Sequence, residues 1–402
     1  MKYVIVIPDG AADEPQDQLE NKTPLQAANT PAMDSVASRG IVGRANHTPR
    51  KFDAGSAVAN MSLLGYDPLE FYSGRAPIEA AASDLKLGPH DWAIRCNLVN
   101  IQNQVMSDFT AGHISTDEAS QLLSVAAENT DDCFEFVTGV SYRNLLIYRG
   151  NEKTPAPFSR ETRTSQPHDL TDLTIVDEFP RGPGSDILTN LMHESSAWFS
   201  DHPVNQKRIA NNQLPATNAW LWGLGQTPKL APFSELHSLN GAMITAVDLL
   251  RGLAKLIGWQ CIDVPSATGY VDTDYAAKGK HAIEALNNFD VVCVHIEATD
   301  EASHEGELQK KVTAIESIDQ EIVQPILDSL DSSGEPWKLL VTPDHPTHLK
   351  TKKHTHGDVP FAMCGTGIDA DSATAYNEAT AAESETAFDQ GYDLMPFFIT
   401  GN

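Results

Sequence analysis

Acidic and imidazole side chains follow the expected buried strands of this 402-residue chain. Asp9 comes directly after the apolar run 3–8, which predicts a strand buried on both faces. Asp300 and His304 follow a second expected strand at 290–296, and their spacing places both on one face of a helical turn. Because ligands gather at the carboxyl ends of strands in an open α/β sheet, we expect these side chains to meet.

A third expected strand at 338–342 is followed by Asp344 and His345, and His354 lies ten residues beyond Asp344. Three carboxylates and three imidazoles form an oxygen and nitrogen ligand set that suits Mn, Zn, Mg or Fe rather than a thiolate metal. Six protein ligands suit two ions, which lie about 3.5–4 Å apart in two-metal sites. The sequence therefore predicts a metal site.

Ser56 is the candidate nucleophile, because Gly55 precedes it and an apolar helix is expected to follow it. The start of a helix offers free N–H groups and a dipole that favour an oxyanion or a phosphate. A serine hydroxyl needs activation near neutral pH, which a bound metal ion provides.

Each of these residues also has a purely structural interpretation. Asp9 in Pro-Asp-Gly is a common turn residue, Asp300 and Ser56 are ordinary helix caps, and a single histidine is usually a hydrogen-bonded structural residue. The combination of strand-end acids and imidazoles with a Gly-Ser helix start favours the functional interpretation.

The predicted elements of the C-terminal half alternate between helix and strand, which favours a parallel sheet covered by helices on both faces. Helices are expected at 30–40, 57–64, 115–128, 243–257, 276–286 and 308–330, the last with a kink at Pro325, and strands at 260–264, 290–296 and 338–342. The segment 370–386 is expected at the surface.

Residues 85–180 differ, because short strand-like runs at 134–137 and 145–148 precede a stretch rich in Pro, Thr, Arg and Asp. We expect a smaller α+β insertion there, with the α/β core formed by residues 1–84 and 181–402.

The net charge of −27 argues against nucleic acid and anionic membranes as partners. No apolar run approaches the roughly 18 residues of a membrane helix, and the N-terminal run is too short for a signal-peptide core. Five widely spaced cysteines without a C-x-x-C pair argue against a disulfide scaffold. We therefore expect a cytoplasmic protein.

The chain resembles the archaeal-type, cofactor-independent (2,3-bisphosphoglycerate-independent) phosphoglycerate mutases of the alkaline phosphatase superfamily, nearly from end to end. The segments that carry the resemblance are Pro8-Asp9-Gly10, Lys22 to Pro31, Gly55-Ser56, Leu63 to Pro68, Tyr72 to Pro77, Ala267-Thr268-Gly269, Lys278, His295 to Gly306 and Thr342 to His345.

The resemblance implies an alkaline-phosphatase-like core with an inserted substrate-binding cap, and conversion of 3-phosphoglycerate to 2-phosphoglycerate through a phosphoserine. It implies two divalent ions, manganese first with Zn, Mg or Fe as alternatives, and no organic cofactor. One ion would be held by Asp300, His304 and His354, and the other by Asp9, Ser56, Asp344 and His345. Ser56, Lys278 and Arg75 would be catalytic, and Arg95, His113 and Arg143 would bind substrate.

Two departures from the family pattern leave questions open. Ala57 stands where many relatives have an acid, which bears on substrate preference. His348 stands where relatives often have proline, and either His348 or His356 competes with His354 as a ligand.

The substrate is expected to be a small phosphorylated anion, and the protein a monomer or a small homo-oligomer. The alternatives are a metal-dependent phosphatase or phosphomutase of another small phosphorylated substrate, including a role in homoserine phosphorylation, and a non-catalytic metal-binding protein.

Overall fold

The computed structural model describes residues 1–401, which divide into two compact units. The core unit comprises Met1–Tyr72 and the chain from Lys229 onward, and the inserted unit comprises Ser73–Pro228. The inserted unit is wider at both ends than the expected insertion of 85–180. Helices and a strand after residue 180 complete the sheet and the apolar core of that unit, so they belong to it.

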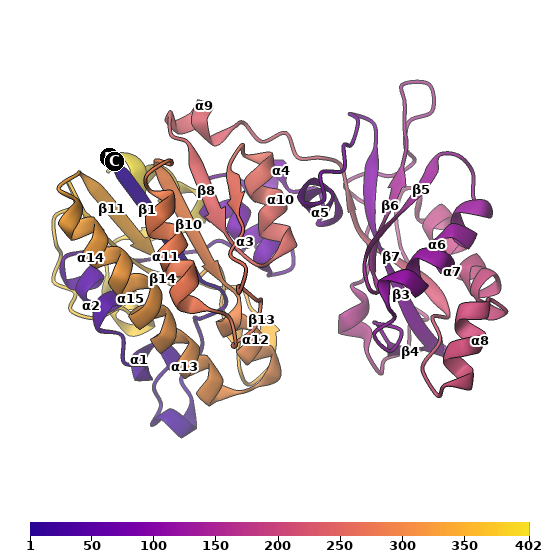
Figure 1. The fold of residues 1–402 in the computed structure, drawn as a ribbon, viewed down its shortest axis with the longest axis horizontal. Coiled ribbons are helices and arrows are strands. Elements are labelled where there is room, and N and C mark those ends of the chain that lie inside the picture. The colour runs from indigo at the N-terminus through magenta and orange to yellow at the C-terminus, as the bar shows by residue number, and fades with distance from the viewer. Residues whose placement is uncertain (402) are drawn as a thin grey trace. The chain divides into compact units, whose positions relative to one another are not determined.

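An eight-stranded sheet forms the centre of the core unit, in the order β15-β2-β14-β11-β1-β10-β8-β9 (Figure 1). Its strands from β11 to β9 are parallel, and β14 runs antiparallel to both β11 and β2. The strands are β1 (Lys2–Pro8), β2 (Gly40–Ala45), β8 (Gly241–Ile244), β9 (Gln260–Ile262), β10 (Val291–Ile296), β11 (Trp337–Val341), β14 (Val359–Gly365) and β15 (Ala387–Phe388). The expected mostly parallel α/β sheet is confirmed.

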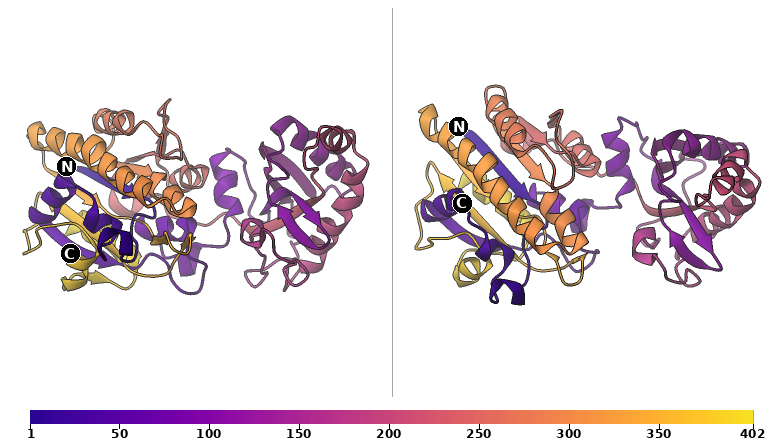
Figure 2. Two further views of the ribbon diagram at one scale, coloured as in Figure 1. Left: turned by 90° about the horizontal axis from the view of Figure 1, so that it is seen from below. Right: turned by 60° about the horizontal axis from the view of Figure 1, so that its bottom comes forward.

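Helices cover both faces of this sheet because its central strands are apolar on both sides. Val4 and Val6 of β1 share a core with α2 (Pro31–Ser38), α11 (Tyr275–Ala285), α13 (Leu308–Ile318) and α14 (Gln324–Ser333). On the opposite face Tyr3 packs edge-on against Phe398 of α16 (Leu394–Thr400). Figure 2 shows the orange helical run from α13 to α14 lying along the sheet.

Two predicted helices differ from the structure. Residues 243–257 begin as β8 and become helical only at α10 (Asp248–Leu256), because a short apolar run alone does not distinguish strand from helix. The helix expected over 308–330 is divided just before Pro325 by a π-helical turn, η3 (Asp319–Val323). Pro325 has no N–H for the carbonyl of Glu321, and the helix adapts by widening before the proline.

The remaining elements of the core unit are short. They are η1 (Asp17–Leu19), α1 (Pro24–Ala27), α3 (Ser56–Leu63), α4 (Pro68–Phe71), α9 (Phe233–His237), α12 (Ala298–Glu305), β12 (Thr347–His348), β13 (Lys353–His354), α15 (Glu378–Glu383) and η4 (Gly391–Asp393). No helix within residues 1–401 is long and apolar enough to cross a bilayer.

The inserted unit is an α+β structure around the long strand β3 (Trp92–Gln102). Its other strands are β4 (Val105–Asp108), β5 (Phe134–Val140), β6 (Arg143–Tyr148) and β7 (Asn218–Gly225), and its helices are α5 (Ala76–Ala82), α6 (Thr116–Glu128), η2 (Pro167–Leu170), α7 (Ser185–Ser200) and α8 (Pro203–Ala210). Strand β3 pairs antiparallel with β4, β6 and β7. The predicted capping box of α6, between Ser115 and Glu118, is present.

Candidate metal centre and active site

Three adjacent strands of the core sheet carry the predicted ligands at their carboxyl ends. Asp9 follows β1, the segment leading to Asp300 follows β10, and Asp344 follows β11. Because β1 lies between β10 and β11 and is parallel to both, these ends meet at one edge. The three aspartates are buried, so the fold brings three carboxylates together away from solvent.

The first predicted ligand group is compact. Asp300 Oδ2 lies 3.0 Å from His304 Nε2, and Asp300 Oδ1 lies 3.4 Å from His354 Nε2. The two imidazole Nε2 atoms are 2.9 Å apart. Burial alone would raise the pKa of Asp300, but His354 and His304 hold its pKa well below the usual value. Against the effect of burial, Asp300 raises the pKa of His304 to about 9.

The second predicted group surrounds His345. Its Nε2 atom lies 3.4 Å from Asp9 Oδ1, 3.4 Å from Asp344 Oδ2 and 3.2 Å from Ser56 Oγ. Burial lowers the pKa of His345, so the ring is neutral, as a metal ligand must be. Ser56 is the first residue of α3, so the predicted nucleophile stands at a helix start beside the predicted ligands.

Neighbouring polar residues that the sequence did not single out hold this arrangement. Asn60, one turn along α3, donates from Nδ2 to Asp344 Oδ2 at 2.7 Å and to the Ser56 carbonyl at 2.9 Å. The hydroxyl of Thr347 lies 2.6 Å from Asp300 Oδ1 and 3.1 Å from His345 Nδ1. In the sequence, only their closeness to predicted site residues points to them. Asn60 is four positions after Ser56, and Thr347 is two positions after His345.

The buried His295 and the partly buried Glu297 are two further groups at this edge. His295 Nε2 lies 2.8 Å from Asp9 Oδ2, and burial lowers the pKa of His295 to about 3. Burial, with the charge of Asp300 next, raises the pKa of Glu297 to about 8. Both residues lie in the segment from His295 to Gly306 that carries the family resemblance.

The donor set fits divalent cations. Burial raises the pKa of Asp9 well above its usual value, and the neighbouring charges of Asp344, Glu297 and Asp300 add to that rise. Asp9 Oδ1 is buried without a hydrogen-bond partner. Three groups of carboxylate and imidazole atoms are close enough to share an ion, namely Asp300, His304 and His354; Asp9, Asp300 and His345; and Asp9, His295 and Asp344. Cations here would neutralise the repelling carboxylates.

The competing histidines lie outside these groups among residues 1–401. The Nδ1 atom of His356 lies 2.9 Å from the Thr48 carbonyl, and His348 pairs with Lys353 in a short ladder. His354 therefore remains the proposed ligand.

Lys278 of α11 is buried in the core unit. Its Nζ donates to the main-chain carbonyl of His295 at 3.3 Å. Burial lowers the pKa of Lys278 to about 8, and the charge of Glu297 partly opposes that fall. The amine thus lies beside the end of β10, the strand that precedes the predicted ligand Asp300.

Arg75 and Arg95 come together in the inserted unit around Glu79, a residue that sequence reasoning missed. Glu79 Oε1 accepts from Arg75 Nε at 2.6 Å, and Glu79 Oε2 accepts from Arg95. Both guanidinium groups lie over the Trp222 ring, at 5.9 and 5.2 Å. Arg95 is 6% exposed, and its Nε has no hydrogen-bond partner. The cluster offers donors to a small anion.

Arg143 and His113 are exposed, and neither is joined to the Glu79 cluster by a hydrogen bond or ion pair given for the described residues. The β3–β6 register sets Arg143 opposite Asn97, two residues from Arg95 on β3, so Arg143 lies on the same face as Arg95. His113 lies in the turn after β4, with a φ of 50°.

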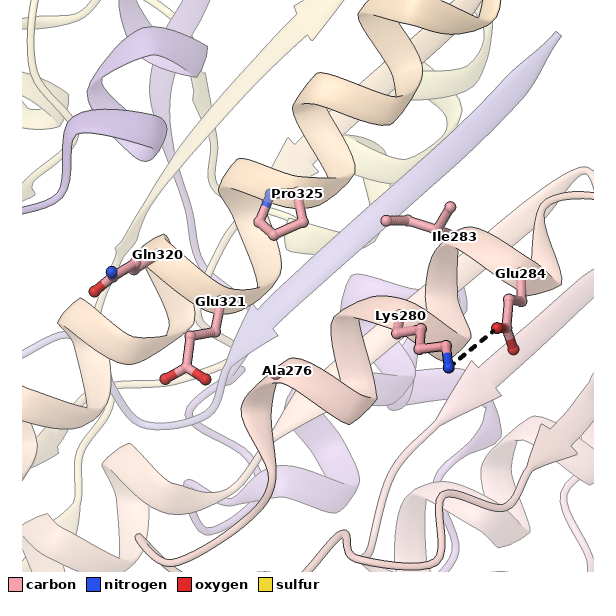
Figure 3. Close-up of a pocket in the computed structure, with 7 residues that line it drawn as sticks. All are labelled: Ala276, Lys280, Ile283, Glu284, Gln320, Glu321 and Pro325. Atoms are coloured by element: carbon pink, nitrogen blue, oxygen red, sulfur yellow. Dashed lines mark ion pairs between the residues drawn. The ribbon is translucent and has the colours of Figure 1, made fainter.

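One surface hollow of the core unit lies elsewhere. It has a volume of about 510 Å³ and lies between α11 and the π-helical turn, lined by Ala276, Lys280, Ile283, Glu284, Gln320, Glu321 and Pro325 (Figure 3). None of these side chains is a predicted site residue. The predicted metal ligands converge instead at the strand ends.

Comparisons with known proteins agree with this geometry. The family described as 2,3-bisphosphoglycerate-independent phosphoglycerate mutase matches residues 37–205. The mutases of that name from Methanothrix thermoacetophila and Methanosarcina barkeri are 41% and 45% identical to this chain, with 100% and 99% of each chain covered. The cofactor-independent phosphoglycerate mutase of Thermoplasma acidophilum has a TM-score of 0.66 at 27% identity, with 99% of each chain covered.

The PH0037 protein of Pyrococcus horikoshii is also similar in structure, with a TM-score of 0.80 at 26% identity. That likeness covers 99% of this chain and 96% of the other. With identities above 40% along its whole length, this chain belongs to the family of 2,3-bisphosphoglycerate-independent phosphoglycerate mutases.

Proposed function

We propose that this enzyme interconverts 3-phosphoglycerate and 2-phosphoglycerate through a phosphoserine at Ser56, beside two divalent metal ions. The observation that carries the proposal is the position of Ser56 Oγ, 3.2 Å from His345 Nε2, a nitrogen that also lies 3.4 Å from carboxylate oxygens of Asp9 and Asp344. Family membership supports the substrate.

The proposed ligands are Asp300, His304 and His354 for one ion, and Asp9, Ser56, Asp344 and His345 for the other. Bound ions would lower the pKa of the serine hydroxyl and neutralise negative charge on the transferring phosphoryl group. Manganese is the first candidate. Asn60 and Thr347 keep Asp344 and Asp300 in place through the hydrogen bonds described above.

The chemical step uses the side chain of Ser56. Its Oγ forms a bond to phosphorus while the bond from phosphorus to one glycerate oxygen breaks. That oxygen takes up a proton, which balances the proton lost by Ser56. The other glycerate hydroxyl then attacks phosphorus, the Oγ–phosphorus bond breaks, and Ser56 regains its proton.

Positively charged side chains would bind the substrate anion against the net charge of −27. We propose that Arg75, Arg95, Arg143 and His113 of the inserted unit contact its carboxylate or phosphate, with Lys278 supplying charge in the core unit. Arginine suits this role because its planar fork donates two parallel hydrogen bonds to such anions.

The direct test is to mix the metal-loaded protein with 3-phosphoglycerate and to follow 2-phosphoglycerate and free phosphate by ³¹P NMR. We expect isomer without stoichiometric phosphate release. Phosphate release without isomer would instead identify a phosphatase, and metal binding without turnover on a panel of phosphate esters would identify a binding protein.

A further inference from the structure

His295 connects two residues of the core unit at the end of β10. Its Nε2 lies 2.8 Å from Asp9 Oδ2, and its Nδ1 lies 3.2 Å from the hydroxyl of Thr245. The same hydroxyl accepts from the main-chain N–H of Val247 at 3.1 Å. His295 is fully buried and Thr245 nearly so, which makes these contacts the partners of both ring nitrogens.

Binding of a cation by Asp9, as in the proposed function, would fix the direction of these hydrogen bonds. A carboxylate that binds a cation is deprotonated and can only accept. The nitrogen 2.8 Å from Asp9 Oδ2 must therefore carry the proton. A neutral imidazole has only one N–H, so Nδ1 is then an acceptor and Thr245 donates its hydroxyl proton to it.

We propose that His295 is a positioning residue for Asp9 and not a metal ligand. In this arrangement Thr245 donates its hydroxyl proton to Nδ1 and so orients the His295 ring. The ring donates its Nε2–H to Asp9 Oδ2, and the other oxygen of Asp9, Oδ1, binds the ion. The inference rests on the metal site of the proposed function. It excludes the group of Asp9, His295 and Asp344 as a set of ligands.

The surroundings of Asp9 agree with this assignment. Asp9 Oδ1 is buried, lacks a hydrogen-bond partner and lies 3.4 Å from His345 Nε2. Glu297 Oε2 lies 3.7 Å from His295 Nε2, outside hydrogen-bond distance, and Asp344 has no hydrogen bond to the ring among those given for the described residues. The donated proton is thus directed to Asp9. Outer partners of this kind orient a ligating carboxylate and tune its affinity.

The first measurement is the affinity of the chelator-treated protein for Mn²⁺ by titration calorimetry. We expect His295→Gln to bind within about threefold of wild type, since a glutamine amide can replace the Nε2–H donor. We expect His295→Leu, which has no donor, to bind about 10–100-fold more weakly. We expect the Mn²⁺ affinity of Thr245→Val to lie between those of His295→Gln and His295→Leu. The matched control is His281→Gln, because His281 Nδ1 lies 2.8 Å from the Ala277 carbonyl of its own helix.

The second measurement is ¹⁵N NMR of histidine-labelled protein with and without Zn²⁺, a diamagnetic probe. We expect His295 to keep its Nε2–H tautomer at saturating metal. Loss of that proton with a metal-shifted Nε2 resonance, or equal losses of affinity in His295→Gln and His295→Leu, would make His295 a ligand and overturn the inference. Unchanged affinity in folded His295→Leu would overturn it too. If wild type binds no metal at all, the proposed function fails instead.

Discussion

Ser56 Oγ lies 3.2 Å from Nε2 of His345, although 289 positions separate the two residues in the chain. The serine begins a helix and the histidine follows a strand, and each is placed by a different part of the core unit. This contact places the candidate nucleophile beside a predicted metal ligand.

Replacing Ser56 with alanine should lower the isomerisation rate about 10³-fold or more, because the phosphoryl acceptor is lost. The rate of 2-phosphoglycerate formation measures this effect. The matched control is Ser62→Ala on the same helix, where the hydroxyl meets His47 Nδ1 at 3.3 Å and touches no predicted ligand. Full turnover in Ser56→Ala would exclude the phosphoserine route.

Chelation should stop isomerisation, and Mn²⁺ or a similar divalent ion should restore it. Removing the ions leaves the buried carboxylates of Asp9, Asp300 and Asp344 to repel one another, so the chelated protein should also unfold at a lower temperature. Activity and Tm, each followed against added metal, check both expectations. Activity that is indifferent to chelator would refute the metal site.

Replacing Glu79 with glutamine should raise KM for 3-phosphoglycerate about tenfold while changing kcat much less, because Arg75 and Arg95 lose the carboxylate that orients them. The burial of Glu79 would raise its pKa, but the two arginines hold it below its usual value. Steady-state kinetics measure the split between KM and kcat.

Breaking such a buried pair also costs stability, about 3–5 kcal/mol by precedent. Asp91→Asn is the matched control, since Asp91 is a buried partner of Arg149 in the same unit, at 2.6 Å. An unchanged KM in folded Glu79→Gln would argue that Arg75 and Arg95 do not bind the substrate.

The carboxyl group of Asp319 should contribute more to the free energy of unfolding at acid pH than at neutral pH. Burial raises the pKa of Asp319 from 3.8 to about 6, although it accepts hydrogen bonds from the N–H groups of Ala32 and Met33. Below pH 3.8 both states hold the proton. Between pH 3.8 and about pH 6 the folded protein keeps the Asp319 carboxyl group protonated and the unfolded chain does not. The free energy of unfolding contributed by Asp319 therefore falls as pH rises.

Urea unfolding of wild type and Asp319→Asn from pH 3.5 to 7 measures this contribution as the difference between the two proteins. We expect the difference to change through that interval and to be constant above about pH 6. A difference independent of pH would show that Asp319 titrates normally.

The sequence by itself determined the local features of this protein. Apolar runs predicted β1, β10 and β11, and the Ser115 and Glu118 pair predicted the start of α6. The acids and imidazoles after the strands predicted a metal-binding edge, since parallel strands end together. The start of a helix after Gly55 predicted Ser56 as the nucleophile, and the resemblance to the family added the mutase reaction and the substrate-binding residues.

Only the tertiary structure decided which side chains surround each other. Residues 241–244 became a strand because β10 offers them a parallel neighbour, which no local pattern reveals. Thr245, His295 and Glu79 found their partners only on folding, since hydrogen bonds between residues far apart in the chain leave no periodic trace in the sequence. Burial then set the pKa values of Asp9 and Lys278, because the loss of solvent depends on everything packed around a group.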